Sequence, residues 1–450
     1  MNSARMKNTG RFGAQRPAEP AEISVNTIKK LLRVMDRDAN VAVPVRPQGA
    51  ATAATDCNQS AAGTVVRMTE LDRILHIDPE NLTVTAQAGI RLYALAEALA
   101  EQRLQLIGNH DMMGRTLGGA IAAPSLGAGI GNESGSLASH VISVKMVSGA
   151  GQPMTVDNKQ PKLLGAMRAS YGLLGVIVEA TLKVQPIATF SATHRRLRID
   201  EFSSIVDTLT NNEVGIRFCM MPYRDRVYLD LRRYAADAGN AYNTPWRIKD
   251  WGESTVMPHV CKSLNILLPI QSVRYRLIDS VTEATQGIIN SRFVRSGSNA
   301  SAQSRTASRA RRVLYSTWCF PATDFSFVLK AYQKFCRETY ERTHYRCDLP
   351  AIGYRVCKDS SAALSPAFDE PMIALQTTSM QRKGWEDFAI DLADFAENWA
   401  GVPIFSQTRS LRADYAKQVF AERLEFFRRI RRQLDPEDRL LTPFMAQYFN

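Results

Sequence analysis

The chain has 450 residues, of which 45% are hydrophobic and 22% are charged, and its formal net charge is +12. This length exceeds the usual size of one hydrophobic core, so two substantial domains are expected, and the composition excludes fibrous and disordered classes. No apolar run reaches the roughly 18 residues that cross a bilayer, and the polar, basic start contains no apolar signal core. We therefore expect a cytoplasmic protein without a transmembrane segment.

Neither the cysteines nor the charge indicates a metal or a nucleic acid. The seven cysteines are scattered and form no C-x-x-C pair, which argues against a disulfide framework and a zinc site. We expect most of them to be small buried apolar residues and predict no metal. The basic residues are spread widely and match no nucleic-acid-binding module, so no nucleic-acid partner is predicted. Their field suits the attraction of an anionic cofactor or substrate.

The first part of the chain predicts short elements that follow a mobile basic tail over residues 1–20. Helical apolar spacing and β-branched runs predict helices at 23–36, 92–101 and near 163–170, and strands at 41–46, 64–68, 82–86, 141–148, 154–156 and 175–184. Eight of the 26 glycines lie between Gly108 and Gly135. At that density the backbone adopts unusual dihedral angles or is closely approached by another group.

After Pro186 the elements lengthen, which indicates a second domain. The pattern predicts a hairpin of strands 214–221 and 226–231, and helices at 325–341, 385–399 and 413–434. Aromatic residues at helical spacing in the last two helices predict core packing rather than a cofactor box. We expect the run Arg423 to Arg432 to be a solvated helix face, residues 291–312 to be an exposed basic loop, and the chain to end in a short apolar tail.

Three segments have the composition of a cofactor site. The loop VRPQGAATAATD, residues 45–56, follows a strand, and its small side chains let consecutive N–H groups point inward around an anion. In RTLGGAIAA, residues 115–123, two glycines stand where a loop enters a helix whose free N–H groups can face a phosphate or a flavin. A glycine-marked turn and strand, residues 170–181, would let the backbone run against a planar ring. An ordinary alanine-rich loop and tight helix packing are the alternatives for the first two segments.

The order of these segments resembles the FAD-binding domain of the vanillyl-alcohol oxidase and p-cresol methylhydroxylase superfamily, in its aldonolactone and alditol oxidase branch. The resemblance covers residues 41–186 through RPQG, LDRILHIDPENLTVTAQAGIRL, TLGGAIA, GSLASHVISVKMVSGAG and GLLGVIVEATLKV. It implies an α+β fold, with a PCMH-type FAD-binding domain of two subdomains and an α+β cap domain that contains an antiparallel sheet. No G-x-G-x-x-G follows a strand at the required place, so bound NAD is disfavoured.

The resemblance also implies the cofactor contacts and the domain bounds. The first loop would hold the FAD pyrophosphate, the second segment and the residues after it would lie along the flavin and its ribityl chain, and the main chain of the third would meet the adenine. The implied FAD-binding residues are Arg46, Pro47, Gln48, Gly49, Ala50, Ala51, Thr52, Ala53, Thr116, Gly118, Gly119, Ala123, Ser125, Gly127, Ser136, Gly175 and Ile177. The expected domains are residues 21–186 for FAD, residues 187–430 for the cap, and a tail of residues 431–450 that returns toward the FAD domain.

Flavin attachment is expected to be non-covalent. In many relatives this first loop supplies a histidine that bonds to the flavin, but the matching residue here is Thr52, which has no nucleophilic nitrogen. His110 and Cys57 are weaker alternatives for attachment.

The cap resembles the family less closely, and its departures concern the chemistry. Gly401 to Leu411 aligns with a family stretch that reads Pro-His-Trp-Gly-Lys, so the family's His, Trp and Lys become Ile404, Phe405 and Gln407. The family's Glu, two residues before its substrate-facing Arg, becomes Gly353. Oxidation of a CH–OH carbon requires hydride transfer and removal of the hydroxyl proton, and a glutamine side chain cannot titrate.

Arg355, Gln407 and Tyr354 are therefore the catalytic candidates, with Tyr354 ranked last. Only one of Tyr354 and Arg355 can face the flavin, because neighbouring strand residues face opposite sides. A salt-bridged strand arginine is the alternative role for Arg355. We expect an FAD-dependent oxidoreductase that takes a hydride from a CH–OH or related carbon of a polar small molecule and passes electrons to oxygen or another acceptor. The substrate is expected to be a biosynthetic intermediate rather than a simple sugar lactone, and the alternative function is a flavin-binding scaffold without turnover.

Overall fold

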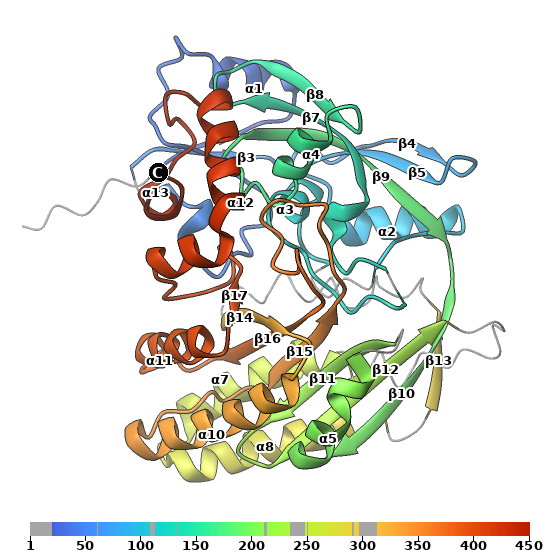
Figure 1. The fold of residues 1–450 in the computed structure, drawn as a ribbon, viewed down its shortest axis with the longest axis vertical. Coiled ribbons are helices and arrows are strands. Elements are labelled where there is room, and N and C mark those ends of the chain that lie inside the picture. Colours follow the sequence, from blue (N-terminus) through green and yellow to red (C-terminus); the bar gives the residue numbers. More distant parts are fainter. Residues whose placement is uncertain are drawn as a thin grey trace, which may run out of the picture.

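The computed structural model describes residues 20–60, 62–108, 113–131, 133–210, 214–234, 248–249, 251–289, 292–296 and 313–450. The predicted tail before residue 20, His110, and residues 291 and 297–312 of the predicted basic loop lie outside them. Within these ranges the chain forms three sheets and their covering helices, arranged as an upper and a lower half in Figure 1. This mixed architecture confirms the predicted α+β class.

A small parallel sheet begins the upper half. Its strands, in the order β1-β3-β2, are β1 (Ala21–Ser24), β3 (Thr64–Arg67) and β2 (Val45–Gln48). Helix α1 (Ile28–Met35) starts at Thr27, whose side chain accepts a hydrogen bond from the backbone N–H of Lys30, an ordinary N-cap. The helix buries Leu31, Val34 and Met35. The 3₁₀ turn η1 (Asp56–Asn58) lies after the predicted phosphate loop.

A six-stranded antiparallel sheet completes the upper half. Its strands are β4 (Ile74–Asp78), β5 (Thr83–Gln87), β9 (Gly175–Pro186), β7 (Val141–Ser148) and β8 (Pro153–Asp157), with β6 (Leu104–Leu106) paired to β9. The helical elements of this part are α2 (Leu92–Glu101), α3 (Leu117–Ala122), η2 (Leu137–His140) and α4 (Pro161–Met167). The strands and helices predicted between residues 82 and 184 are confirmed, within a few residues at their ends.

The lower half contains an eight-stranded antiparallel sheet in the order β13-β10-β12-β11-β15-β16-β14-β17. Its strands are β10 (Thr189–Leu197), β11 (Gly215–Met221), β12 (Arg226–Tyr234), β13 (Arg292–Ser296), β14 (Leu314–Pro321), β15 (Ala351–Val356), β16 (Met372–Ser379) and β17 (Val402–Pro403). The predicted hairpin is confirmed as β11 and β12. The prediction of a basic loop from residue 291 is wrong for Arg292 to Ser296, which pair with β10.

Helices cover this sheet and form part of its core. They are α5 (Ile199–Thr210), the π-helical turn η3 (Gly252–Val256), α7 (Met257–Leu267), α8 (Gln271–Gly287), α10 (Phe325–Thr343) and α11 (Trp385–Asn398). Trp385, Phe388 and Leu392 of α11 are buried in the main hydrophobic cluster, which confirms the prediction of core packing. All seven cysteines are free and buried, as predicted.

The C-terminal segment lies beside the upper half (Figure 1). It consists of α12 (Ala413–Leu434) and α13 (Pro443–Phe449), so the predicted apolar tail is largely a helix. The prediction of a solvated arginine face on α12 is wrong in part. Arg428 and Arg431 are buried, and Arg428 donates to the carbonyl of Tyr448 because α13 packs against that side of α12. Across the described residues, no helix is long and apolar enough to span a membrane.

Candidate functional site: a cavity between the phosphate loop and α3

A cavity of about 780 Å³, its open mouth included, lies where the predicted phosphate loop meets α3. All the predicted FAD-binding residues line it except Ser125, Gly127 and Ser136. The structure thus brings together three segments that are far apart in the sequence.

The loop offers a row of free backbone donors. Among the described residues, the N–H groups of Gly49 to Ala53 donate to no protein group, whereas the next N–H, of Ala54, donates to the Ser406 carbonyl at 2.9 Å. Ala51 has a φ of 55°, in the left-handed region. Successive free N–H groups around a left-handed residue form an anion-binding concavity. The loop therefore has the geometry that a pyrophosphate requires.

Arg46 holds this loop in place. Its guanidinium, 2% exposed, donates to four carbonyl oxygens, those of Cys57, Tyr171, Gly172 and Leu440, at 2.6–3.2 Å. Burial lowers the pKa of Arg46 to about 10, so the side chain stays charged at neutral pH. Its direct role is to join the loop to the turn before β9 and to the C-terminal segment.

The lower half contacts the same loop. The Tyr315 hydroxyl of β14 donates to the Thr52 carbonyl at 2.6 Å, and the Thr55 hydroxyl donates to the Phe405 carbonyl at 2.7 Å. These bonds fix the loop against β14 and the segment that follows β17.

The charge of the cavity fits a cofactor with a pyrophosphate. Arg46 and Arg115 are the charged residues among its described lining, which contains no carboxylate. Arg115 is 3% exposed and donates to the Pro124 carbonyl at 3.0 Å. A buried cation without a counter-ion is costly, and a bound anion offsets that cost. The free N–H groups and both arginines therefore suit FAD.

The glycines of the site have different roles. A Cβ on Gly118 would lie 2.8 Å from the Ala88 side chain, and one on Gly175 would lie 2.3 Å from Met146, so both glycines are required by protein packing. A Cβ on Gly49 would lie 2.0 Å from the Thr116 hydroxyl oxygen, because the loop packs directly against Thr116, the N-cap of α3. Of the predicted cofactor glycines in this cavity, Gly119 has the least crowded Cβ position.

Ser125, Gly127 and Ser136 belong to the segment after α3. An isolated bridge joins Leu126 to Ser136, and the Ser125 hydroxyl is buried without a hydrogen-bond partner among the described residues. The hydroxyl of Ser406, which lines the cavity, is in the same state. Each of these orphaned buried hydroxyls, one from each half of the protein, is available to a polar ligand.

Both polar atoms of the Gln407 side chain form hydrogen bonds within the protein. Its amide oxygen accepts from the Thr317 hydroxyl at 3.0 Å, and its amide nitrogen donates to the Pro124 carbonyl at 3.1 Å. The side chain is 2% exposed and joins β14 to the segment after α3. Gln407 therefore positions the two halves, and it is absent from the lining of the cavity.

The structure separates Tyr354 from Arg355. Tyr354 packs in a cluster with Leu126 and Ile404, so it faces the upper half. Gly353, on the opposite face, is covered by the Phe218 ring, and strand alternation places the Cβ of Arg355 on that face too. The Arg355 guanidinium nevertheless reaches the upper half, where it donates to the Gly131 carbonyl at 3.4 Å, and it also lies 3.3 Å from the Cys357 sulfur. Neither Tyr354 nor Arg355 lines the cavity, and Tyr354 packs toward the upper half.

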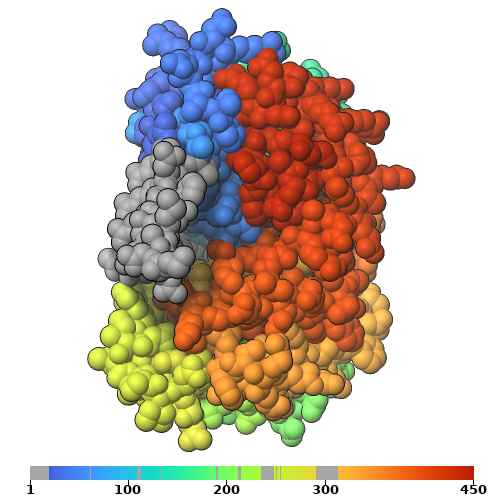
Figure 2. Space-filling view, turned by 90° about the vertical axis from the view of Figure 1, so that its left-hand side faces the viewer, coloured from blue at the N-terminus to red at the C-terminus, as the bar shows by residue number. Residues whose placement is uncertain are grey.

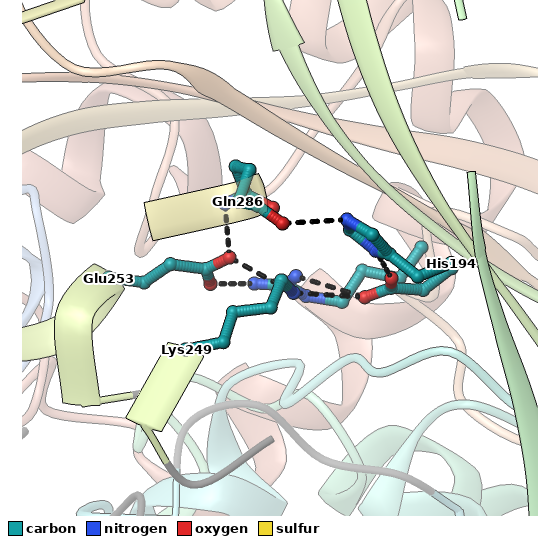
Figure 3. Close-up of polar contacts among 6 residues, drawn as sticks. His194, Lys249, Glu253 and Gln286 are labelled. Carbon is teal, nitrogen blue, oxygen red and sulfur yellow. Dashed lines mark hydrogen bonds and ion pairs between the residues drawn. The ribbon is translucent and has the colours of Figure 1, made fainter. Parts of the chain in front are cut away.

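A second polar cluster lies on the Tyr354 face of the lower sheet. The strand register places His194, Asp230, Arg217 and Tyr354 in one row across β10, β12, β11 and β15. Figure 3 shows the cluster, in which His194 Nδ1 lies 2.5 Å from an Asp230 oxygen and Lys249 Nζ lies 3.1 Å from Glu253 and 3.3 Å from Asp230.

Every carboxylate of this cluster has cationic partners. Burial opposes ionisation of Asp230, but Lys249 and His194 outweigh it and lower the pKa of Asp230. Burial likewise opposes ionisation of Glu253, and Arg217 and Lys249 lower its pKa to about 2. The cluster is a compensated network rather than an open site. No group of metal-ligating side chains occurs among the described residues, so no structural feature contradicts the prediction that metal is absent.

Several lining residues were not predicted as cofactor contacts. They are Asn58, Met68, Ala88, Arg115, Ala122, Tyr171 and Gly172, whereas Cys57 was considered only as an alternative attachment residue. Arg115 stands directly before the TLGGA motif, so its position was a usable signal. Met68 and Ala88 come from β-strand ends and carry no such signal.

Comparison with known proteins identifies both halves. A model of the FAD-binding domain matches residues 21–157, and a model of D-arabinono-1,4-lactone oxidase matches residues 180–448. The chain is 28% identical over 215 residues to L-gulono-1,4-lactone dehydrogenase of Mycobacterium tuberculosis, a match that covers 48% of this chain and 49% of that protein. It is 26% identical to D-arabinono-1,4-lactone oxidase of Kluyveromyces lactis, over 38% of this chain and 32% of that protein. The matched region spans about half or less of these relatives.

Solved structures share the fold. Cholesterol oxidase from B. sterolicum matches with a TM-score of 0.78 at 13% identity, over 100% of both chains. Xylooligosaccharide oxidase from Myceliophthora thermophila, in complex with xylobiose, matches with a TM-score of 0.67 at 14% identity, over 95% of this chain and 91% of that one. The predicted family resemblance is confirmed: this chain has an FAD-binding domain and belongs to the D-arabinono-1,4-lactone oxidase family.

Proposed function

We propose that this protein binds FAD without a covalent bond and uses it to oxidise a CH–OH or related carbon of a polar small molecule. The observation that carries the proposal is the cavity, where five loop N–H groups donate to no described protein group and two buried arginines form no ion pair with a described carboxylate. Bound FAD would supply the hydride acceptor, and oxygen or another acceptor would take the electrons. The cofactor would be held by the fourteen lining residues named above from the sequence and by Arg115.

The absence of a covalent link is supported by the side chains at the loop. Thr52 occupies the position from which many relatives supply histidine, and its carbonyl is bonded to Tyr315. Cys57 lines the cavity, but burial raises the pKa of its thiol, so little reactive thiolate exists at neutral pH. His110 lies outside the described residues.

The substrate would lie between residues 21–186, the proposed FAD domain, and residues 187–430, the proposed cap. Tyr354 faces the upper half, and Ser125 and Ser406 have buried hydroxyls without partners among the described residues. We assign these three side chains to substrate orientation, and Gln407 to positioning. With Ile404 and Gln407 at the family's His and Lys positions, catalysis would depend on orientation over the flavin. This favours a biosynthetic intermediate over a simple sugar lactone.

Anaerobic reduction of the holoprotein tests this activity. A panel of lactones, alditols and other polar alcohols would be added to protein with full FAD content, and flavin absorbance would be recorded. At least one substrate is expected to bleach the flavin, and Tyr354→Phe is expected to slow that bleaching about tenfold or more at unchanged FAD content. Bleaching at an unchanged rate would remove Tyr354 from the proposal.

The hydrogen bonds of the Gln407 side chain within the protein favour one alternative function. If the polar groups that relatives use for chemistry now join the two halves, the protein could be a flavin-binding scaffold that has lost turnover. Full FAD content with no bleaching by any member of a broad panel would favour the scaffold over the oxidoreductase.

A further inference from the structure

The α7–α8 hairpin exposes a cluster of large aliphatic side chains. At its turn, Ile266 is 74% exposed, Leu267 is 71% exposed and Ile270 is 62% exposed. Val273 and Leu277 on α8 are also exposed. Scattered apolar residues are normal on a protein surface, but a contiguous group of this kind indicates an interaction site.

The exposed group is separate from the hairpin's own packing. Met257 and Cys261 of α7 pack against Ile278 of α8 in a buried cluster. On α8, Ile270, Val273 and Leu277 follow the spacing of one helix face, and this face lies away from the buried residues Tyr275 and Ile278. Helix α8 therefore has a second apolar face that its own fold does not cover.

The exposed charges nearest the turn are cationic, although α8 also carries Asp279, which pairs with Arg224 and Arg346, and Glu283 farther along the helix. Between Glu253 and Asp279 the sequence contains no acidic residue, whereas it contains Lys262, Arg274 and Arg276. Lys262 and Arg276 are exposed, and Arg274 is buried and bonded to the Gln381 side chain. Exposed aliphatic side chains with two exposed cations beside them suit contact with an anionic membrane surface.

We propose that the α7–α8 hairpin docks this protein on an anionic lipid bilayer, with Ile266, Leu267 and Ile270 inserted among the headgroups. The hairpin, yellow in Figure 2, forms the lower left corner of that view, so a flat surface can reach it. Self-association through the same surface would place the cations of two copies against each other, which disfavours a second copy as the occupant. The hairpin contributes no residue to the FAD cavity, so this proposal does not depend on the proposed function.

Vesicle flotation tests the docking. Full-length holoprotein would be mixed with vesicles of phosphatidylcholine alone, or with about one third phosphatidylglycerol, at low and high salt. Flotation is expected with the anionic vesicles and is expected to weaken with salt. The triple variant Ile266→Ser, Leu267→Ser, Ile270→Ser is expected to bind these vesicles about tenfold more weakly or worse.

Two control variants isolate the surface. Ile390→Ser removes an aliphatic side chain that is 52% exposed on α11, and it is expected to float as the unchanged protein does. Lys262→Glu with Arg276→Glu is expected to weaken flotation, whereas Lys417→Glu on α12 is expected to leave it unchanged. Flavin absorbance and circular dichroism of each variant would show that it is folded.

Three results would overturn the proposal. They are no flotation of the unchanged protein, flotation of the triple variant equal to that of Ile390→Ser, and a dimer without lipid that the triple variant abolishes. The second result would indicate that another basic part of the chain binds the vesicles. The third would assign the surface to a second copy.

Discussion

In the lower sheet, Arg217 and Lys249 lie 2.9–3.6 Å from the carboxylates of Asp230 and Glu253, whereas in the cavity Arg46 and Arg115 contact only carbonyl oxygens. Lys249, Arg46 and Arg115 are buried, and the Arg217 side chain is 12% exposed. In the first group the opposite charges were brought together by the strand register and by the helical residues that cover the sheet. In the second group, no described carboxylate lies within ion-pair distance, and Asp435 attracts Arg46 only from farther away.

This difference distinguishes cations that are paired within the fold from cations that are available to a bound anion. Burial of a cation costs several kcal/mol unless a partner offsets it, so a protein that leaves a buried arginine unpaired needs some other source of compensation. Carbonyl dipoles supply part of it at Arg46 and Arg115. The free N–H groups beside them increase the positive potential, so an anionic ligand is the natural counter-charge. The following predictions test this distinction.

The largest expected effect is on the compensated network. Asp230→Ala removes the common partner of His194, Lys249 and Arg217, and it should destabilise the protein by about 3–5 kcal/mol because buried cations lose their counter-charge. The urea midpoint measures this loss. Lys334→Ala, which breaks an exposed pair with Glu338, should change stability by less than about 0.5 kcal/mol. Similar midpoints for the two variants would contradict the structural role of the network.

The same network predicts an acid sensitivity. Because the pKa of Glu253 is lowered to about 2, its contribution is fully present above the unfolded value near 4.5 and is lost as the pH falls toward 2. The loss should reach about 3 kcal/mol at most. Urea midpoints between pH 7 and pH 3 measure it. Glu253→Gln should be less stable at pH 7 and should show a flatter decline below pH 4.5, and equal declines would refute the prediction.

Unlike the loss of Asp230, the loss of Arg115 should weaken FAD binding and change the stability of the protein little. Arg115→Met keeps an unbranched side chain but removes the charge, so FAD should bind about 10- to 100-fold more weakly, a loss of about 1.5–3 kcal/mol. The urea midpoint of the apoprotein should change far less than in Asp230→Ala. Titration of apoprotein with FAD, followed by flavin fluorescence, gives the affinity. An unchanged affinity would mean that Arg115 carries a structural charge.

Ala51 should give the smallest effect. Its φ of 55° costs an L-residue free energy that glycine avoids, although glycine also loses more chain entropy on folding. Ala51→Gly should therefore change stability by no more than about 1 kcal/mol and should keep FAD binding, whereas Ala51→Val should weaken both. The same titration and urea midpoints measure the two variants. If Ala51→Val bound FAD normally, the left-handed loop geometry would not be required.

The sequence predicted local structure well where a single pattern, such as helical apolar spacing, determined it. Helices α2 and α12 match their predicted bounds because of their apolar spacing, although α12 is kinked at Ala421, which has non-helical dihedral angles. The cavity loop was identified because small residues follow a strand. The hairpin α7–α8 was not predicted, since its apolar residues lie on two faces and give no single periodicity.

Side-chain partners could not be predicted. The sequence shows that Gln407 cannot titrate, but only the fold shows that Thr317 and Pro124 occupy its amide. Strand alternation required that Tyr354 and Arg355 face opposite sides, without showing which faces the cavity half. Arg428 and Arg431 were assigned to solvent because α13 was read as a tail, and that helix covers them.

The most direct test of the central claim is an absorbance spectrum of the purified protein from 300 to 550 nm, before and after acid denaturation. The native protein is expected to show the two flavin bands, and free FAD is expected in the supernatant once the protein is precipitated. Yellow colour that stays with the precipitate would contradict the non-covalent site. A colourless protein that takes up no added FAD would contradict the assignment of the cavity itself.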